Sequence, residues 1–189
     1  MEKEQALQSA LFERVNQKKL AHHGRVADVE EWDVTLPDGR PAKREIIVHP
    51  GAAAVLPLDA EGNVTMVYQF RHPLGRVTLE IPAGKKEQGE KHLTCAVREL
   101  REEVGLLAQK MTLLTELATS PGIFNEQIAI YLATGLTSCS TDPDEDEFLN
   151  VRKFPLSQLA EMVLRGEIRD SKTIVAIMLT WEKQKRGEI

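Results

Sequence analysis

The chain has 189 residues, of which 42% are hydrophobic and 28% are charged, and its formal net charge is −5. This length and balance predict one globular domain with an added element, and no run of about eighteen apolar residues predicts a membrane span. The negative charge argues against sequence-independent binding to nucleic acid, which requires a basic surface. The first residues lack the layout of a secretory signal and only two cysteines occur, so we expect a cytoplasmic protein without disulfides.

Strands and helices are predicted from the apolar periodicity and from the turn residues. A partial apolar stripe over residues 4–19 predicts a short helix or an irregular segment. Alternating residues predict a strand over 26–36, a turn at 37–39 and a return strand over 43–49. Further strands are predicted over 51–58, 64–71, 77–81, 111–118, 127–133 and 149–154. Helices are predicted over 90–104, from 155 to about 166, and from about 170 onwards.

Strands dominate the middle of the chain, and helices interrupt or follow them. This order predicts an α+β or mixed α/β fold in which helices pack on the faces of a sheet. The two strands before residue 50 form a separate antiparallel hairpin in this arrangement. We therefore expect an N-terminal extension over 1–49 and the main domain over 50–189.

The most informative segment reads GKKEQGEKHLTCAVRELREEVGL and runs from Gly84 to Leu106. In the predicted helix, Glu99, Glu102 and Glu103 share one face because they are three and four residues apart. Like charges at these spacings repel, and hard divalent ions such as Mg²⁺ take carboxylate ligands together with phosphate oxygens of a substrate. We therefore predict a divalent metal site on this helix, with a solvated acidic face as the alternative.

Other residues of this segment have predicted structural roles. We expect Gly84 in a loop that turns sharply and lies close to a ligand, with the Ala83 carbonyl facing the metal. We expect Gly105 to end the helix in the left-handed conformation, and Arg98 to hold Glu99 or Glu102 through a bidentate contact. An apolar stripe of the helix is predicted to pack on a sheet, and it consists of Leu93, Ala96, Val97, Leu100 and Val104.

The segment follows the pattern G-x5-E-x7-R-E-U-x-E-E-x-G-U, where U is aliphatic. This pattern resembles the signature of the Nudix pyrophosphohydrolases at every position. The resemblance covers the chain from about Pro50 to the last helix, and it implies the Nudix αβα sandwich with a mixed sheet over 50–189. It also implies Mg²⁺, with Mn²⁺ as a substitute, and the ligands it implies are Ala83, Glu99, Glu102 and Glu103.

Residues outside the signature resemble those of the ADP-ribose pyrophosphatase subgroup: Pro121, sixteen residues after Gly105, and the segments 43–45 and 69–85. The resemblance implies that Arg71 contacts the substrate phosphates and that Arg44 reaches the site of the partner subunit in a strand-swapped homodimer. Surface solvation is the alternative role of both arginines, and composition alone favours a simple turn at Pro121. The further substrate-binding residues that the resemblance implies are Ser120, Gly122 and, near the terminal ribose, Glu126.

The acidic loop over 142–147 resembles the loop that brings a catalytic glutamate over the metals in this subgroup. Glu145 and Glu147 both match positions used there, and Glu102 is a further catalytic candidate. A solvated acidic loop is the alternative. The chain departs from the family after Gly24, where an adenine-stacking aromatic is expected, and the nearest aromatic is Trp32.

The implied function is Mg²⁺-dependent hydrolysis of ADP-ribose to AMP and ribose 5-phosphate by a cytoplasmic homodimer. Its partner is a small nucleoside diphosphate sugar, and neither nucleic acid nor a membrane is expected. The alternatives are hydrolysis of GDP-mannose or of another nucleoside diphosphate sugar, and a non-catalytic ADP-ribose sensor on the same fold. The sequence leaves open the exact substrate, the number of metal ions, the phosphorus attacked and the pathway.

Overall fold

The computed structural model describes residues 2–142 and 148–189, and its contacts divide the chain into two units. Unit 1 consists of Met1–Pro50 and Ser120–Glu126, and unit 2 consists of Gly51–Thr119 and Gln127–Ile189. The short segment Ser120–Glu126 joins unit 1 through backbone hydrogen bonds to Ile47, whose N–H donates to the Ile123 carbonyl at 2.8 Å. Spacing along the chain did not indicate this association.

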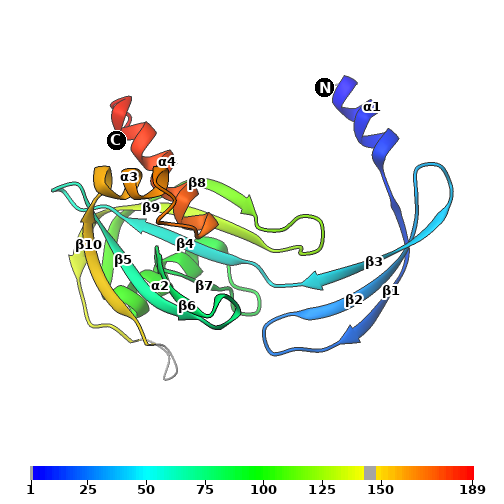
Figure 1. The fold of residues 1–189 in the computed structure, drawn as a ribbon, viewed down its shortest axis with the longest axis horizontal. Helices are drawn as coiled ribbons and strands as arrows, with labels where there is room; N and C mark the ends of the chain where they lie inside the picture. Colours follow the sequence, from blue (N-terminus) through cyan, green and yellow to red (C-terminus); the bar gives the residue numbers. More distant parts are fainter. Residues whose placement is uncertain (1, 143–147) are drawn as a thin grey trace. The chain divides into compact units, whose positions relative to one another are not determined.

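Unit 1 is a three-stranded antiparallel sheet that follows a short helix (Figure 1). Its elements are α1 (Glu2–Leu11), β1 (Arg14–His22), β2 (Asp28–Thr35) and β3 (Pro41–Val48). The two strands predicted in this region are β2 and β3. The prediction for 4–19 is wrong after Leu11, because β1 is a strand whose nine residues are all exposed. It has no alternating burial and is defined by its backbone pairing with β2.

Unit 2 contains two sheets, of which the first has the order β7-β4-β9-β8 and the second has the order β10-β5-β6. Strands β4 and β9 pair in parallel and the other neighbours are antiparallel, so the first sheet is mixed as predicted. The strands are β4 (Ala52–Pro57), β5 (Asn63–Arg71), β6 (Arg76–Glu80), β7 (Ala83–Lys85), β8 (Leu106–Ala118), β9 (Gln127–Ser138) and β10 (Asn150–Pro155). The helices are η1 (His72–Leu74), α2 (His92–Val104), α3 (Leu156–Leu164) and α4 (Ser171–Lys185).

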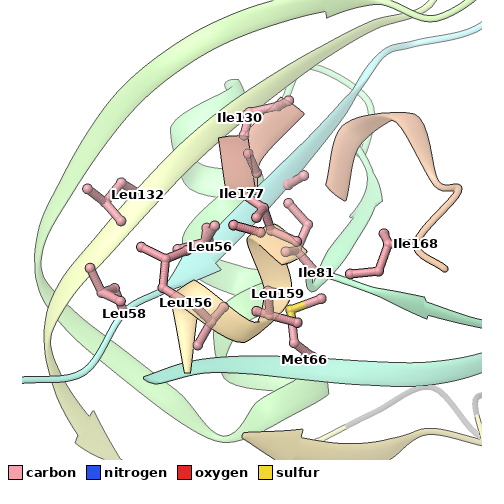
Figure 2. Close-up of a cluster of buried hydrophobic side chains, with 14 of the residues drawn as sticks. Leu56, Leu58, Met66, Ile81, Ile130, Leu132, Leu156, Leu159, Ile168 and Ile177 are labelled. Carbon is pink, nitrogen blue, oxygen red and sulfur yellow. The ribbon is translucent and has the colours of Figure 1, made fainter. Parts of the chain in front are cut away.

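The central strands bury both of their faces. On β4, Ala53 and Val55 pack with α2, whereas Ala52, Ala54 and Leu56 pack with residues of α3 and α4. This alternation follows from the two-residue period of a strand and places a helical layer against each face. Figure 2 shows the cluster on the α3 and α4 side, which includes Leu56, Ile130, Leu159 and Ile177.

Helix α2 differs from its prediction in two respects. It begins at His92 rather than at residue 90, and its apolar stripe is rotated. Leu93 and Val97, predicted to pack, are 47% and 43% exposed, because Glu99 and Glu103 occupy the side of the helix that faces β7 and β4. In the described parts of the chain, none of the helices combines the length and apolarity needed to cross a bilayer.

Candidate active site

Two carboxylates of α2 are buried. Glu99 is 7% exposed and Glu103 is 4% exposed, four residues apart on the side of the helix that carries Cys95, Leu100 and Val104 into the core. Burying an ionised carboxylate is unfavourable unless partners compensate its charge. Burial of two carboxylates on one helix costs free energy, and a purely structural role would not require it.

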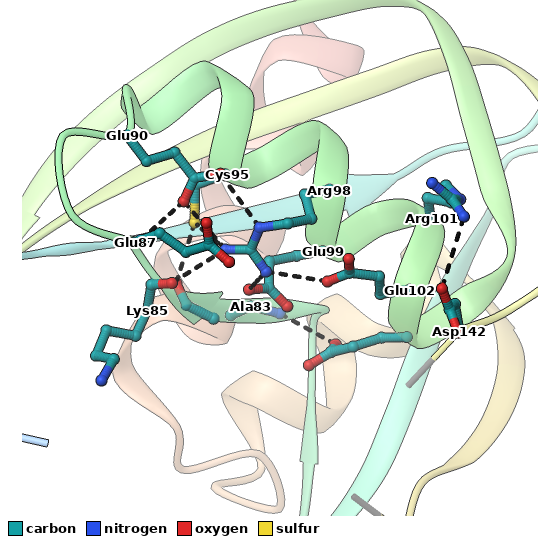
Figure 3. A network of polar contacts seen from close by, with 12 residues as sticks. Ala83, Lys85, Glu87, Glu90, Cys95, Arg98, Glu99, Arg101, Glu102 and Asp142 are labelled. Atoms are coloured by element: carbon teal, nitrogen blue, oxygen red, sulfur yellow. Dashed lines mark hydrogen bonds and ion pairs between the residues drawn. The ribbon is translucent and has the colours of Figure 1, made fainter. Parts of the chain in front are cut away.

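Arg98 joins three carboxylates of the site (Figure 3). Its Nε and Nη2 donate to the two oxygens of Glu90, each at 3.1 Å. Its Nη1 donates to Glu99 Oε1 at 2.6 Å and to Glu102 Oε2 at 3.0 Å. The bidentate contact that was expected with Glu99 or Glu102 is made with Glu90 instead, and Glu99 and Glu102 share a single nitrogen. These hydrogen bonds, led by those of Glu90, raise the pKa of Arg98 and keep the guanidinium charged.

Glu90 lies just before the helix and fixes the preceding loop. The Glu87 N–H donates to Glu90 Oε2 at 2.9 Å, and Arg98 Nη2 also donates to the Lys85 carbonyl at 3.1 Å. The hydrogen bond from Arg98 lowers the pKa of the Glu90 carboxyl. Glu90 thus holds residues 85–90 against Arg98. Its position in the sequence pattern, eight residues before Arg98, did not indicate this role.

Position 84 requires glycine because its backbone lies close to the Glu99 carboxylate, and not because the chain turns there. The prediction of a sharp loop is wrong, since Gly84 lies in β7, pairs with Ala53 and does not have a positive φ. A Cβ at this position would lie 2.0 Å from Glu99 Oε1, so a side chain there would displace the carboxylate. The neighbouring Ala83 N–H donates to Glu103 Oε2 at 3.2 Å. The β7 backbone therefore lies directly against both buried carboxylates.

The end of α2 is fixed as predicted, with Gly105 in the left-handed region at φ 62°. The Cys139 N–H donates to the Gly105 carbonyl at 2.8 Å, and the Asp142 N–H donates to the Glu102 carbonyl at 3.1 Å. The segment that leads into the acidic loop is thus hydrogen-bonded to the end of α2. The two loop glutamates that sequence analysis predicted, Glu145 and Glu147, lie outside the described residues.

Cys95 lies within the same cluster and is protected from ionisation. Its Sγ donates to the Gly84 carbonyl at 3.4 Å, and the residue is fully buried. Burial, and after it the charge of Glu99, raise the pKa of the thiol to about 12. A thiol with this pKa is a poor nucleophile at neutral pH, so chemistry at this site does not involve a cysteine thiolate.

The donor chemistry of the α2 site fits a hard divalent ion. Its side-chain donors are carboxylate oxygens, two of them buried, and Gly84 keeps the backbone of β7 close to them. Over residues 2–142 and 148–189, no three His, Cys, Asp or Glu side chains have the geometry to hold a metal ion. Glu99 and Glu102 are turned toward Arg98 instead. The residues thus supply suitable ligands, while their present arrangement is organised by Arg98.

Arg71, the predicted phosphate-binding residue, belongs to the same unit as α2. It lies at the end of β5 and donates from Nε and Nη2 to the two oxygens of Glu80 at 2.8 and 2.7 Å. Lys172 of α4 also donates to Glu80. Sequence analysis missed Glu80 and Lys172. The available signal for Glu80 was a carboxylate within the otherwise apolar end of a predicted strand.

The remaining predicted residues belong to unit 1 and are described within it. Arg44 Nη2 lies 2.6 Å from Glu13 Oε1, and Glu126 Oε1 lies 3.4 Å from His49 Nδ1. The Ser120 carbonyl accepts hydrogen bonds within the turn that contains Gly122. The structure brings together Ala83, Gly84, Glu90, Arg98, Glu99, Glu102 and Glu103 in unit 2, whereas Arg44, Ser120, Gly122 and Glu126 belong to unit 1.

Trp32, the nearest aromatic to Gly24, lies on β2. Its Nε1 donates to Glu30 Oε2 at 2.6 Å, and the Lys18 ammonium lies 3.9 Å from the ring centroid. Trp32 is partly buried, and Val34 is the fully buried residue of this strand. Both ring contacts come from neighbouring positions of the same sheet, so Trp32 has a structural role within unit 1.

Residues 48–176 match the family model of the NUDIX domain. The chain therefore belongs to the Nudix family. A solved structure described as an ADP compounds hydrolase superposes with a TM-score of 0.81, covers 94% of this chain and 97% of its own, and is 23% identical. At this identity the likeness establishes the fold, and it confirms the predicted α+β Nudix architecture.

Individual relatives are similar over most of this chain. An ADP-ribose pyrophosphatase of Bacillus subtilis (strain 168) is 44% identical over 170 residues, which are 89% of this chain and 92% of the relative. A methanol dehydrogenase activator of Bacillus methanolicus is 42% identical over 156 residues, covering 82% and 84%. An ADP-ribose pyrophosphatase of Mycobacterium tuberculosis (strain ATCC 25618 / H37Rv) is 40% identical over 171 residues, covering 88% and 82%.

Proposed function

We propose that this Nudix enzyme hydrolyses the diphosphate of ADP-ribose and releases AMP and ribose 5-phosphate. The observation that carries the proposal is the pair of buried carboxylates on α2, Glu99 and Glu103, which lie against the side-chain-free backbone of Gly84. Two relatives at 44% and 40% identity are ADP-ribose pyrophosphatases, which supports ADP-ribose over other substrates of the family.

We infer that Glu99, Glu102, Glu103 and the Ala83 carbonyl hold Mg²⁺, for which Mn²⁺ can substitute. When bound, such an ion neutralises diphosphate charge and lowers the pKa of a water molecule. The chain's own contribution is to orient the carboxylates. Arg98 does so from one side through its contacts to Glu99 and Glu102, and the Ala83 N–H does so for Glu103.

We further propose that Glu145 or Glu147 orients the attacking water and accepts its proton. The support is the flanking backbone, since the Asp142 N–H donates to the Glu102 carbonyl at 3.1 Å and Arg101 lies 3.7 Å from the Asp142 carboxylate. The loop that carries both glutamates thus begins beside the last turn of α2. A carboxylate within reach of the water is the group that general-base catalysis requires.

Arg71 and Arg44 are the proposed phosphate-binding residues, because the planar guanidinium matches phosphate oxygens. Arg44 serves the partner's site in a strand-swapped homodimer, and Ser120, Gly122 and Glu126 contact the substrate, Glu126 near the terminal ribose. We also propose a cytoplasmic location. Both Cys95 and Cys139 are free thiols, as expected of a protein in a reducing compartment.

Three other functions are to be distinguished from hydrolysis of ADP-ribose. Activation of a dehydrogenase is supported by the 42% identity to the methanol dehydrogenase activator. Hydrolysis of GDP-mannose or of another nucleoside diphosphate sugar uses the same carboxylates and differs only in the base and sugar that are bound. A non-catalytic ADP-ribose sensor is disfavoured, because such a protein has no need of buried carboxylates.

The test is nucleotide release from purified protein with and without Mg²⁺. We expect AMP from ADP-ribose only when the ion is present, and far less GMP from GDP-mannose at the same concentration. Faster GMP release would favour the alternative substrate. Binding of ADP-ribose by calorimetry without any turnover would favour the sensor. Stimulation of a dehydrogenase that persists without Mg²⁺ would indicate an activity separate from hydrolysis.

A further inference from the structure

A buried carboxylate lies behind Arg71 and has no role in the chemistry described above. Glu80 is the last residue of β6, and its side chain is 3% exposed. It accepts hydrogen bonds from Arg71 Nε and Nη2, from the Thr78 hydroxyl and from the Lys172 ammonium. A carboxylate offers about four acceptor positions, so these four donors satisfy Glu80 completely.

Lys172 is held in place by the first turn of α4. Asp170 caps this helix, and its Oδ2 accepts from the Thr173 N–H at 3.0 Å and from the Thr173 hydroxyl at 2.6 Å. The Thr173 hydroxyl in turn accepts from the Ile81 N–H at 3.0 Å, directly after β6. Asp170 Oδ1 lies 3.0 Å from the Lys172 ammonium. The start of α4 and the end of β6 are thus joined on both sides of Glu80.

Among the described residues, the guanidinium of Arg71 is hydrogen-bonded along one edge, by Glu80. Two of its five N–H groups donate to Glu80, which leaves three for another acceptor. The Arg71 side chain is 38% exposed, and it lines a hollow of about 240 Å³ with Pro73, Leu74 and residues of the Glu80 cluster. The held edge is buried, and the other edge is accessible.

Arg71 also lies within electrostatic range of the α2 site. Its hydrogen bonds to Glu80 are the main cause of its raised pKa, and the charges of Asp170 and Glu103 add to that rise. Glu103 is one of the two buried carboxylates of α2. The charges of Arg71 and Glu103 are therefore close enough to interact.

We propose that Glu80 is a positioning residue, which holds the Arg71 guanidinium with its remaining N–H groups toward the substrate diphosphate. This inference rests on the proposed hydrolysis of ADP-ribose. A bidentate carboxylate contact fixes the plane of a guanidinium, so the arginine loses less side-chain entropy when it binds phosphate. Lys172, which is itself paired with Asp170, keeps the Glu80 carboxylate in one orientation.

The test is the kinetics of Glu80→Gln, which keeps the shape of the side chain and removes its charge. We expect the KM for ADP-ribose to rise about tenfold, the effect of losing roughly one charge-assisted contact, while kcat changes by less than about threefold. Glu182→Gln is the matched control, since it removes an arginine-paired carboxylate from the exposed part of α4. We expect the control to leave both constants unchanged.

A double-mutant cycle separates positioning from a general structural effect. If Glu80 acts through Arg71, adding Glu80→Gln to Arg71→Met produces no further loss of kcat/KM, whereas independent roles give additive losses. Additive losses would overturn the inference. If Glu80→Gln does not fold, Thr78→Val removes one hydrogen bond to the same carboxylate, and we expect a KM rise of about two- to threefold.

The outcomes distinguish this inference from the function on which it rests. A wild-type protein that never releases AMP from ADP-ribose overturns both. A wild-type protein that does release AMP, together with a Thr78→Val variant and a folded Glu80→Gln variant of unchanged KM, overturns the positioning role alone. A selective rise in KM that disappears in the Arg71→Met background supports it.

Discussion

Two clusters of charged residues in unit 2 differ in their ratio of carboxylates to cations. Around Arg98, the three carboxylates of Glu90, Glu99 and Glu102 share one guanidinium. Around Glu80, one carboxylate is shared by the two cations Arg71 and Lys172. The first group has more carboxylates than cations. In the second group, the charge of Glu80 is compensated by Arg71 and Lys172. An excess of buried carboxylate indicates a site for a cation from outside, and a satisfied group indicates a fixed support.

The largest expected effect is that of Glu103→Gln, which removes a buried carboxylate from the α2 site. We expect kcat for ADP-ribose to fall by a factor on the order of 10² to 10³, because charge stabilisation in the transition state is lost. Stability should change little, since the amide oxygen can still accept from the Ala83 N–H. AMP release and thermal unfolding measure the two effects. Activity within twofold of wild type would show that the cation site lies elsewhere.

Gly84→Ala is the next largest and tests whether the backbone must lie against Glu99. Its Cβ would lie 2.0 Å from Glu99 Oε1, and the carboxylate at the end of a flexible side chain would have to move. We expect activity to fall by roughly 10- to 100-fold and stability by less than about 2 kcal/mol. Gly187→Ala is the control, since it has a positive φ but no atom within 4 Å. It should lose stability and keep activity.

The strand-swapped dimer predicts a recovery of activity in mixtures. If Arg44 serves the partner's site, Arg44→Ala and Glu103→Gln are each weakly active alone, but a heterodimer contains one intact site. Random exchange of subunits should then restore about a quarter of wild-type activity. Gel filtration and AMP release measure assembly and recovery. A fully active monomer, or a mixture no more active than its components, would contradict the swapped arrangement.

The smallest expected effect is the acid dependence of stability at Glu80. Burial alone would raise the pKa of this carboxyl, but the hydrogen bonds of Arg71 and the charge of Lys172 outweigh it and lower the pKa from 4.5 to about 2. Because the folded-state pKa is depressed, the ionised group stabilises the fold above pH 4.5 and loses this contribution as the pH falls toward 2. The contribution is at most about 3 kcal/mol.

Glu80→Gln cannot titrate and therefore reports on this contribution. The difference in the free energy of unfolding between wild type and variant should be largest at neutral pH and should shrink as the pH falls below 4.5. Urea unfolding at neutral pH and at about pH 3 measures it. A difference that does not change with pH would show that the carboxyl is not ionised in the folded protein.

The three glutamates of α2 were predictable from the sequence because they lie on consecutive turns of one helix. Spacing alone predicted that Glu99, Glu102 and Glu103 share one face of the helix. It also predicted that Gly105 ends the helix in the left-handed conformation. The second group was not predictable in this way, since Glu80 and Lys172 are 92 residues apart and meet only through packing. The rotation of α2 was missed because apolar spacing does not reveal that β7 approaches the helix at Gly84.

The N-terminal strand β1 shows the same limit in unit 1. Its residues from Arg14 to His22 are all exposed, so no alternation of apolar side chains marks them as a strand. Its pairing with β2 is a property of the backbone that neighbouring sequence does not encode. By contrast, β2, β3 and the strands of unit 2 other than β7 were predicted, although β8 and β9 are longer than the predicted segments. Strand β7 was missed because a loop was expected at Gly84.

The two thiols differ in accessibility, so that one of them can be labelled selectively in the wild-type protein. Cys95 is buried with a pKa of about 12, so maleimide reagents should not modify it while the protein is folded. Cys139 is partly exposed, and its backbone is hydrogen-bonded to Gly105 at the end of α2. A fluorophore attached there would require no substitution, and its emission would report directly on changes beside α2 when nucleotide or metal is added.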